Sequence, residues 1–487
     1  MEQFRIAIVG SGFSGLGTAI RLKRAGIHDF VVLERATDLG GTWRDNDYPG
    51  CCCDIPSHVY SFSFELNPGW TRGFASQAEI LDYLRRTARK YGVMPHIRFD
   101  HEMQSATWDE QAQRWMIDTA QGSFSAQILV SAAGPLSDPS IPDIPGLAEF
   151  DGAVFHSARW KHDHDLSGER VAVIGTGASA IQFVPQIQPK VARLHLFQRT
   201  PPWVVPRLDY RITPAEHWLL RWVPFAPALV RAALYWFLEV RMVGFRSPKV
   251  MSGASRLARW HLRRQVPDPA LRARLTPDYT LGCKRVLVSD DYYPALTRPN
   301  VEVITDGVRE VRARSVVTTA GDELEVDTII LGTGFHVTDN PIASRVRGRQ
   351  GKTLAQVWSP SMRAYLGMSV AGFPNLFVII GPNTALGHNS MVFMIESQLN
   401  YLMGCLEAMR RRGASTVEVR ADAVAAFNDE IDRAMQGTVW SAGCNSWYLD
   451  SAGRNSVIWP RWSFSFRART RHFEPQKYVM SRAPSGR

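Results

Sequence analysis

The pattern of apolar positions near the N-terminus predicts a strand, a tight turn, a helix and a second strand. Residues 4–9 are mostly apolar and end at Gly10, residues 16–25 carry apolar side chains at helical spacing, and residues 30–33 are again apolar. Short apolar runs without alternation, bounded by glycine, are typical of buried parallel strands. We expect the rest of the chain to be organised around this unit.

The same pattern returns in the middle of the chain. Residues 170–174 and 194–197 are apolar runs on either side of a helical pattern, and residues 328–335 repeat the glycine-ended strand of residues 128–134. Strands that alternate with helices predict an α/β fold. We therefore expect two Rossmann-like dinucleotide-binding domains, the first formed by residues 1–145 and 336–487 and the second by residues 146–335.

Further patterns predict individual elements. They are an amphipathic helix over residues 77–91, a strand hairpin over residues 108–129, a linker over residues 150–160, a strand over residues 375–380, and a helix that begins at Asn389 or Ser390, runs to Met409 and stops at Gly413.

Residues 205–277 interrupt the second domain with a segment rich in Trp, Leu and Phe at helical spacing. Arginines recur through it, at positions 221, 231, 241 and 246. The pattern predicts an inserted helical subdomain. Its side chains are compatible with ordinary core helices, with an amphipathic surface that makes peripheral contact with a membrane, and with an apolar funnel for a hydrophobic substrate.

The turn after the first strand, GSGFSG, has the spacing of a dinucleotide-binding loop. Gly10 permits the tight turn, Gly12 lets a pyrophosphate approach the backbone, and Gly15 lets the helix pack closely on the strand. The phosphates then lie at the helix N-terminus, and Glu34 accepts a hydrogen bond from a ribose hydroxyl. Because a carboxylate repels a 2′-phosphate, this site suits FAD or NAD and not NADP.

A second such turn begins at Gly175 and continues through Thr176, Gly177, Ala178 and Ser179. Arg199 follows Gly175 by 24 residues, as Glu34 follows Gly10. The two units therefore present opposite charges at the same topological position. Because a guanidinium grips a 2′-phosphate bidentately, we expect FAD at the first site and NADPH at the second.

Composition narrows the classes of function. The chain has 487 residues and a formal charge of +10, with arginines scattered along its length and no basic-aromatic array, which argues against nucleic-acid binding. Its N-terminus enters the first strand within a few residues, and no uncharged apolar run reaches the ~20 residues of a membrane span. We therefore expect neither a signal peptide nor a transmembrane segment.

The six cysteines lie at positions 51, 52, 53, 283, 405 and 444, without zinc-site spacing or the pattern of a disulfide framework. This usage predicts no metal site and a reducing, cytoplasmic location. The three adjacent cysteines are interpreted as small packed side chains, since flavin disulfide reductases separate their redox pair by intervening residues.

Together these motifs resemble the class B flavoprotein monooxygenases, and most closely the Baeyer–Villiger monooxygenases. The segment Phe150-x-Gly152-x-x-x-His156-x-x-x-Trp160 is similar to that family's fingerprint and lies, as there, between two nucleotide motifs. A longer signature is matched by residues 40–54. Lys161 departs from the pattern, which usually continues with Pro or Asp, and related N- and S-oxidising enzymes carry Tyr or Phe in the place of Trp160.

The resemblance implies roles for particular residues. Lys284 helps to hold the NADPH phosphate, Arg285 lies over the flavin with Asp54 as its paired carboxylate, Trp447 closes over the nicotinamide, and His156 governs domain motion. The catalytic residues are thus Arg285 and Asp54. The residues expected to bind the cofactors are Gly10, Gly12, Phe13, Ser14, Gly15, Glu34, Arg35, Gly41, Thr42, Trp43, Arg44, Asp54, Tyr60, Met103, Gly134, Gly175, Thr176, Gly177, Ala178, Ser179, Arg199, Thr200, Lys284, Asn383 and Trp447.

By the same resemblance, NADPH reduces the flavin, which captures molecular oxygen as a C4a-peroxide that attacks a small hydrophobic ketone and gives an ester or lactone. Arg285 would favour the peroxide anion and stabilise the charge of the adduct. Three alternatives stay open: a monooxygenase that oxidises nitrogen or sulfur, a flavoprotein dehydrogenase, and a non-catalytic nucleotide sensor.

Overall fold

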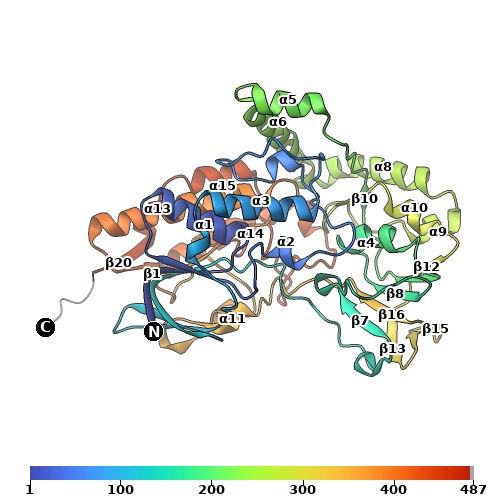
Figure 1. Ribbon diagram of the computed structural model, residues 1–487, viewed down its shortest axis with the longest axis horizontal. Helices are drawn as coiled ribbons and strands as arrows, with labels where there is room; N and C mark the ends of the chain where they lie inside the picture. The colour runs from blue at the N-terminus through green and yellow to red at the C-terminus, as the bar shows by residue number, and fades with distance from the viewer. Residues whose placement is uncertain (483–487) are drawn as a thin grey trace.

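The structure, a computed structural model, describes residues 1–482 and has two main sheets that lie side by side (Figure 1). The first sheet has the strand order β17-β4-β5-β6-β1-β2-β3, and β18 also pairs with β6. Its strands are β1 (Glu2–Val9), β2 (Phe30–Leu33), β3 (Ile97–Arg98), β4 (Met103–Asp109), β5 (Arg114–Thr119), β6 (Gly122–Ser131), β17 (Val346–Arg347) and β18 (Leu376–Val378).

β1 lies at the centre of this sheet, in parallel register with β2 and β6, so that Ile6 is opposite both Phe30 and Ile128. One face packs against the helices α1 (Phe13–Arg24), α3 (Gln77–Lys90) and α13 (Met391–Arg412). The other packs against α11 (Ile342–Arg345) and α12 (Leu354–Trp358). Burial on both faces explains why β1 reads as an unbroken apolar run.

The hairpin predicted over residues 108–129 is confirmed by the antiparallel pair β5-β6, and β4, most of which precedes that region, extends it to a three-stranded meander. The first half of β6 pairs with β5, and its second half pairs in parallel with β18. A strand that pairs with two different strands along one edge does not show a single alternation of apolar and polar residues in its sequence.

The second sheet is parallel and has the order β12-β9-β8-β16-β7. Its strands are β7 (Ala153–His156), β8 (Arg170–Ile174), β9 (Arg193–Phe197), β12 (Val301–Ile304) and β16 (Thr328–Leu331). The segment that we interpreted as a linker therefore contains an edge strand, with His156 opposite Leu331. The sequence analysis missed this strand because it has only four residues and borders polar positions.

The predicted inserted helices lie between β9 and β12 and rise from the body at the top of Figure 1, where α5 and α6 stand furthest out. They are α5 (Pro214–Trp222), α6 (Ala226–Val240), α7 (Met242–Phe245), α8 (Pro248–Gln265) and α9 (Pro269–Arg274). Within residues 1–482, no single helix has the length and hydropathy to cross a membrane; α5 with α6 and α7 meets that test only as a pair bent by 110°.

The helix predicted after residue 389 is α13. Ser390 caps it by accepting a hydrogen bond from the amide of Val392, and Gly413 ends it in the left-handed conformation, with a φ of 60°. The remaining elements are α2 (Thr42–Asp45), α4 (Ala180–Ile187), α10 (Tyr292–Leu296), α14 (Ala421–Met435), α15 (Ser463–Arg469), β10 (Val204–Val205), β11 (Leu287–Val288), β13 (Val308–Arg312), β14 (Ser315–Thr318), β15 (Glu323–Glu325), β19 (Thr416–Val419) and β20 (Tyr478–Ser481).

Candidate active site

The turn between β1 and α1 is as tight as its glycines predict. Gly10 has a φ of +101°, and a Cβ there would lie 2.7 Å from the carbonyl oxygen of Ala132. A Cβ on Gly15 would lie 1.8 Å from the carbonyl oxygen of Gly10, which shows how closely α1 packs on the strand. Larger residues at either position would therefore displace the helix N-terminus.

A cavity begins at this turn, on the side of the first sheet. Residues of the first dinucleotide turn, of the longer signature and of the C-terminal part of the chain line it together, and Arg285 completes the wall. Among the predicted residues, those in its wall are Gly10, Gly12, Phe13, Ser14, Glu34, Arg35, Gly41, Thr42, Trp43, Arg44, Tyr60, Met103, Gly134, Arg285 and Trp447. Gly15 lies beneath the turn, and Asp54 touches the cavity through its partner Arg285.

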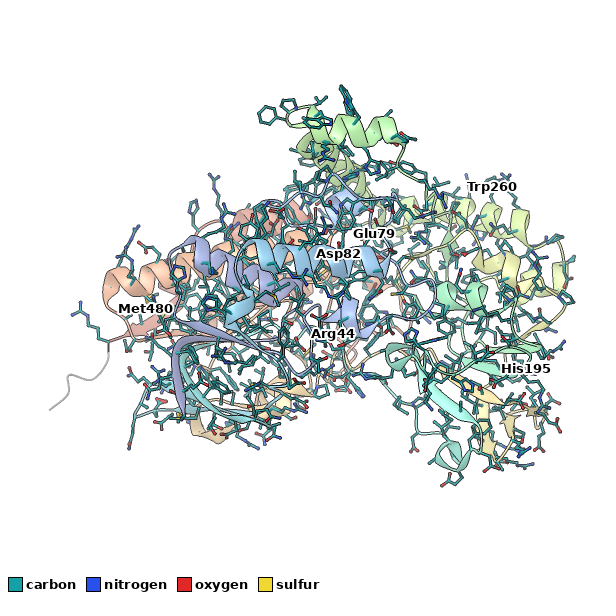
Figure 2. All side chains as sticks on the ribbon, viewed as in Figure 1. Arg44, Glu79, Asp82, His195, Trp260 and Met480 are labelled. Atoms are coloured by element: carbon teal, nitrogen blue, oxygen red, sulfur yellow. A yellow bond between two sulfur atoms is a disulfide. The ribbon has the colours of Figure 1, made fainter. Side chains whose placement is uncertain are left out.

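Glu34 stands at the end of β2 as predicted, and its carboxylate is held on both oxygens. Oε2 accepts hydrogen bonds from the amide and hydroxyl of Ser11, at 3.0 and 2.6 Å, and Oε1 accepts one from Arg44 Nη1 at 2.7 Å. Figure 2 shows Arg44 near the middle of the molecule. Burial acts to lower the pKa of Arg44, but the charges of Glu34 and Asp45 raise it above its ordinary value. Glu34 thus belongs to a paired network, which the sequence analysis did not foresee.

Arg285 and Asp54 form an ion pair across 231 residues of sequence. Arg285 donates from Nε and Nη2 to the same oxygen, Asp54 Oδ2, at 2.9 and 2.5 Å. The two side chains are 29% and 25% exposed, so the pair is partly shielded from solvent. The charge of Asp54 raises the pKa of Arg285 above its ordinary value. The guanidinium is therefore charged at every pH at which the protein is folded.

Beside this pair lies the C-terminal segment that carries Trp447 and Tyr448. Both line the cavity, and their rings lie 4.4 Å apart between centroids. Trp447 is 44% exposed, whereas Tyr448 is buried. Burial raises the pKa of Tyr448 to about 12, although the nearby charge of Arg285 opposes the shift. Tyr448 was not among the predicted residues; its place directly after Trp447 was the available signal.

A disulfide joins Cys283 to Cys444 and corrects the expectation that the cysteines remain unpaired. The bond connects the segment before Arg285 to the segment before Trp447, which lie 161 residues apart in the sequence. The cytoplasmic location stays a prediction, and its cysteine argument is weakened by this pair. The other four cysteines are free, and the three adjacent ones are buried or half-buried, as expected for packed side chains.

The second dinucleotide turn lies at the carboxyl ends of β8 and β9. Gly175 has a φ of +110°, and a Cβ there would lie 2.4 Å from the carbonyl oxygen of Gly332. Thr176 Oγ1 donates to the carbonyl of Thr200 at 3.4 Å, and Gly177 and Ala178 are exposed. Ser179 precedes α4 without capping it through its side chain.

Two cations meet near this turn. Arg199 follows β9 by two residues and is exposed, while Lys284 is half-buried with its Nζ 4.7 Å from the centroid of the Tyr279 ring. Burial and the charge of Arg199 lower the pKa of Lys284. Within residues 1–482, neither cation is within 4.0 Å of a carboxylate oxygen. Two unpaired cations beside a dinucleotide turn are suited to a phosphate.

The fingerprint residues form a compact group at the edge of the second sheet. A Cβ on Gly152 would lie 2.1 Å from the carbonyl oxygen of Asp327, Phe150 is buried, and the Trp160 ring packs on Phe183 at 5.3 Å. His156 is 3% exposed, and its Nδ1 accepts a hydrogen bond from the amide of Ala158 at 3.1 Å. Burial lowers the pKa of His156 to about 4, so the ring is neutral near pH 7.

Asn383 lies away from the cavity wall and has a structural environment. It is 2% exposed, donates to the carbonyls of Asn455 and Ile458 at 2.9 and 3.0 Å, and accepts from Arg454 at 3.1 Å. Its side chain holds the segment around Arg454 to Ile458 in place. The expectation of cofactor binding rested on the place of Asn383 after a strand, and it stays a prediction.

Comparison with known proteins connects these features. Residues 7–221 match the family described as pyridine nucleotide-disulphide oxidoreductase. The chain is 52% identical to a Baeyer–Villiger monooxygenase of Streptomyces coelicolor, over 99% of this chain and 94% of that protein. It is 50% identical to a Baeyer–Villiger monooxygenase of Pseudomonas aeruginosa, over 99% and 92%. The chain belongs to the Baeyer–Villiger monooxygenase family.

Solved structures of Baeyer–Villiger enzymes share the whole fold. A closed crystal structure of cyclohexanone monooxygenase has a TM-score of 0.89 at 26% identity, covering 99% of this chain and 100% of the other. An oxidised steroid monooxygenase bound to NADP has a TM-score of 0.85 at 29% identity, covering 98% and 99%. The predicted resemblance and the predicted fold class are therefore confirmed.

Proposed function

We propose that this Baeyer–Villiger monooxygenase binds FAD in the cavity at the β1 turn and NADPH at the β8 turn, and that it oxidises a small hydrophobic ketone to an ester or lactone. The enzyme class and both cofactors are those predicted from the sequence. One ketone, one O2, one NADPH and one proton are consumed, and the ester or lactone, NADP+ and one water are formed. The observation that supports the ketone reaction best is the Arg285–Asp54 pair in the wall of the cavity.

The residues at the first turn fit FAD. A Cβ on Gly12 would meet only the backbone of the facing loop, Gly41 Cα at 3.6 Å and the carbonyl oxygen of Gly40 at 3.8 Å, so the backbone is open to close approach. No side chain caps the amides of α1, and its first turn carries no acidic residue. Free amides at a helix N-terminus bind a pyrophosphate. Glu34 lies where an acceptor for the ribose hydroxyls is required.

The residues at the second turn fit NADPH. A Cβ on Gly177 would meet nothing within 4 Å, and Arg199 and Lys284 supply two positive charges. Guanidinium and ammonium groups together neutralise a 2′-phosphate, which NADH lacks. We assign residues 146–335 to this domain and residues 1–145 and 336–487 to the FAD domain, with the Phe150 to Trp160 segment as the element that governs their relative movement.

FAD reduced by NADPH supplies the activation of O2, and the side chains around it decide how the oxygen is used. Arg285 keeps a positive charge where negative charge develops on the ketone oxygen. Asp54 fixes the direction of the guanidinium through two hydrogen bonds to one oxygen. A single preorganised donor of this kind contributes on the order of 3 kcal/mol, about 100-fold in rate.

The lining of the cavity supports an apolar substrate and the exclusion of water. Leu386, Met391, Ile395 and Val457 form one part of its wall, and Trp447 with Tyr448 form another. Expelling water strengthens the field of Arg285 inside the cavity. Which ketone is the natural substrate is a question for a product screen.

The screen incubates the FAD-loaded protein aerobically with NADPH and cyclic, linear and steroidal ketones, and identifies products by mass spectrometry. We expect a gain of one oxygen with ester or lactone fragmentation. Arg285→Ala should lower that product rate about 100-fold while NADPH is still oxidised. Arg309→Ala, on an exposed arginine of β13, is the control and should behave as wild type. Full ketone oxidation by Arg285→Ala, or oxygen transfer to thioethers and amines alone, would contradict the proposal.

A further inference from the structure

α6 turns a stripe of large apolar side chains to solvent, while its inward face combines the buried Leu238 with polar groups. In the stripe, Leu229, Trp236, Phe237 and Val240 recur at helical spacing and are 68%, 54%, 62% and 62% exposed. A surface helix of a globular protein normally turns polar residues to solvent. This exposed stripe calls for a partner, because large contiguous apolar patches are rare on free surfaces.

The inward face of α6 is held by polar contacts. Arg231 Nη1 donates to the carbonyl of His58 at 3.0 Å, and Tyr235 shares a hydrogen bond of 2.9 Å with Ser463. Glu239, fully buried, accepts from the amide of Ser463 at 2.6 Å and from Asn389 at 2.8 Å. These contacts fix the rotation of the helix, so the apolar face cannot turn inward.

The loop between α5 and α6 extends the patch to the most protruding part of the molecule (Figure 1). Trp218 and Trp222 on α5 are 61% and 65% exposed, and Phe225 at the turn is 79% exposed. On α8, Leu257 and Trp260 are also half exposed, and Figure 2 shows Trp260 on the outer edge of that helix. We call the exposed apolar residues of α5, α6 and the turn between them the insert patch.

The charge around the insert patch is almost entirely positive. Residues 214–265 contain nine Lys or Arg and two Asp or Glu. Of the two carboxylates, Glu239 is buried and Glu216 is engaged in the capping box of α5. Arg221 lies 5.5 Å from the ring of Trp222, and Arg241 lies 5.0 Å from the ring of Phe237. Two of the protruding aromatic rings, Trp222 and Phe237, thus have a cation beside them.

We propose that the insert patch is a docking surface for an anionic lipid bilayer. Aromatic rings with neighbouring arginines match the boundary between acyl chains and phosphate headgroups, since the rings enter the apolar layer while the guanidiniums contact the phosphates. A second copy of the chain is a poorer occupant. A two-fold dimer places the same patch on both sides, and the arginines would then face one another.

The geometry indicates a helix pair that lies in the interface and does not cross it. α5 and the α6–α7 unit are bent by 110° relative to one another. α5 is shorter than a span, and the α6–α7 unit does not by itself have the length and hydropathy of one. The turn at Phe225 is the deepest element, with the apolar face of α6 following along the surface. The depth of insertion is that of a monotopic protein.

Docking on a membrane brings the cavity close to an apolar ketone that is dissolved in the lipid. This consequence rests on the proposed function. The inner face of α6 touches the start of α13, where Tyr235 and Phe393 lie 4.9 Å apart between ring centroids. Met391 and Ile395 of the same helix line the cavity. Lipid binding itself is independent of the reaction and is tested without substrate.

The test is flotation of the FAD-loaded full chain with vesicles of phosphatidylcholine alone and with added phosphatidylglycerol. We expect flotation with the anionic vesicles, and its loss at high salt because exposed charges are screened. The variant Trp222→Ser/Phe225→Ser/Phe237→Ser should lower the partition coefficient about 100-fold. The matched control is Ile141→Ser/Val357→Ser/Val479→Ser, which alters exposed apolar residues elsewhere and should bind as wild type.

Two further measurements keep the outcomes distinct. FAD content and NADPH oxidation in solution should be unchanged in both triple variants, which shows that they are folded. Arg221→Glu/Arg241→Glu should remove the preference for anionic vesicles. Absence of wild-type flotation, equal flotation of the patch variant, or a wild-type dimer in sedimentation velocity that the patch variant disrupts without any lipid binding would each overturn the proposal.

Discussion

Replacing Asp54 by Asn tests whether the carboxylate acts through Arg285. The substitution keeps the size of the side chain but removes the charge that accepts two hydrogen bonds from the guanidinium. A hydrogen bond to a charged group contributes about 1.5–3 kcal/mol. The pair is about a quarter exposed, which places the loss toward the middle of that range, about 2 kcal/mol. We therefore expect ester or lactone formation to fall about 30-fold.

The assay measures NADPH consumption and product formation on the same samples. Because Asp54 is expected to act by orienting Arg285, NADPH oxidation should fall much less than product formation, and hydrogen peroxide should account for the difference. The control is Asp38→Asn. Arg85 holds Asp38 Oδ2 from Nε and Nη2 with the same two distances, 2.9 and 2.5 Å, outside the cavity. A product rate for Asp54→Asn within about twofold of wild type, with unchanged coupling, would refute the reasoning.

Two further predictions concern the second dinucleotide site and the fingerprint. Arg199→Ala, two residues after β9, should lower kcat/KM for NADPH by about 10- to 100-fold and leave that for NADH unchanged, whereas Arg193→Ala, at the other end of β9, should change neither. Equal losses with both cofactors would contradict a 2′-phosphate contact. His156 has a folded pKa near 4 and an unfolded value near 6.5, so stability is complete above about pH 6.5 and falls toward pH 4 as the unfolded chain takes up the proton, by about 3 kcal/mol. Between pH 6.5 and pH 4, the melting temperature of His156→Asn should fall by less than that of wild type. The control His162→Asn, at an exposed histidine, should fall as wild type does. Equal decreases in all three proteins would contradict a lowered pKa of His156.

Local sequence patterns predicted the two dinucleotide turns and the elements beside them, because the interactions that form these elements are between residues close in sequence. The tight turns at Gly10 and Gly175, the strands beside them and the caps of α13 each depend on a few adjacent residues. The hairpin and linker predictions were incomplete where pairing with distant strands decides the structure. β6 serves two partners along one edge, and β7 is a strand only because β16 lies beside it.

The candidate site was less accessible to sequence reasoning because its members come from distant segments. The Arg285–Asp54 pair was expected through the family resemblance and not from spacing, since 231 residues separate the partners. The Cys283–Cys444 bond spans 161 residues, and six cysteines allow many pairings. Cofactor binding by Asn383 stays a prediction, because a position after a strand looks the same in sequence whether the residue faces a ligand or a neighbouring loop.

The strand order also has a consequence for synthesis of the chain. β18 and α13, which complete the edge and the cover of the first sheet, follow every strand of the second sheet in the sequence. Domains generally fold as units while the chain emerges from the ribosome. Until residue 378 has emerged, the part of β6 from Leu129 to Ser131 lacks β18, its neighbour on one of its two edges. The domain that is translated first is therefore completed last, and the FAD cavity, with Met391 and Trp447 in its wall, exists only when nearly the whole chain has been made.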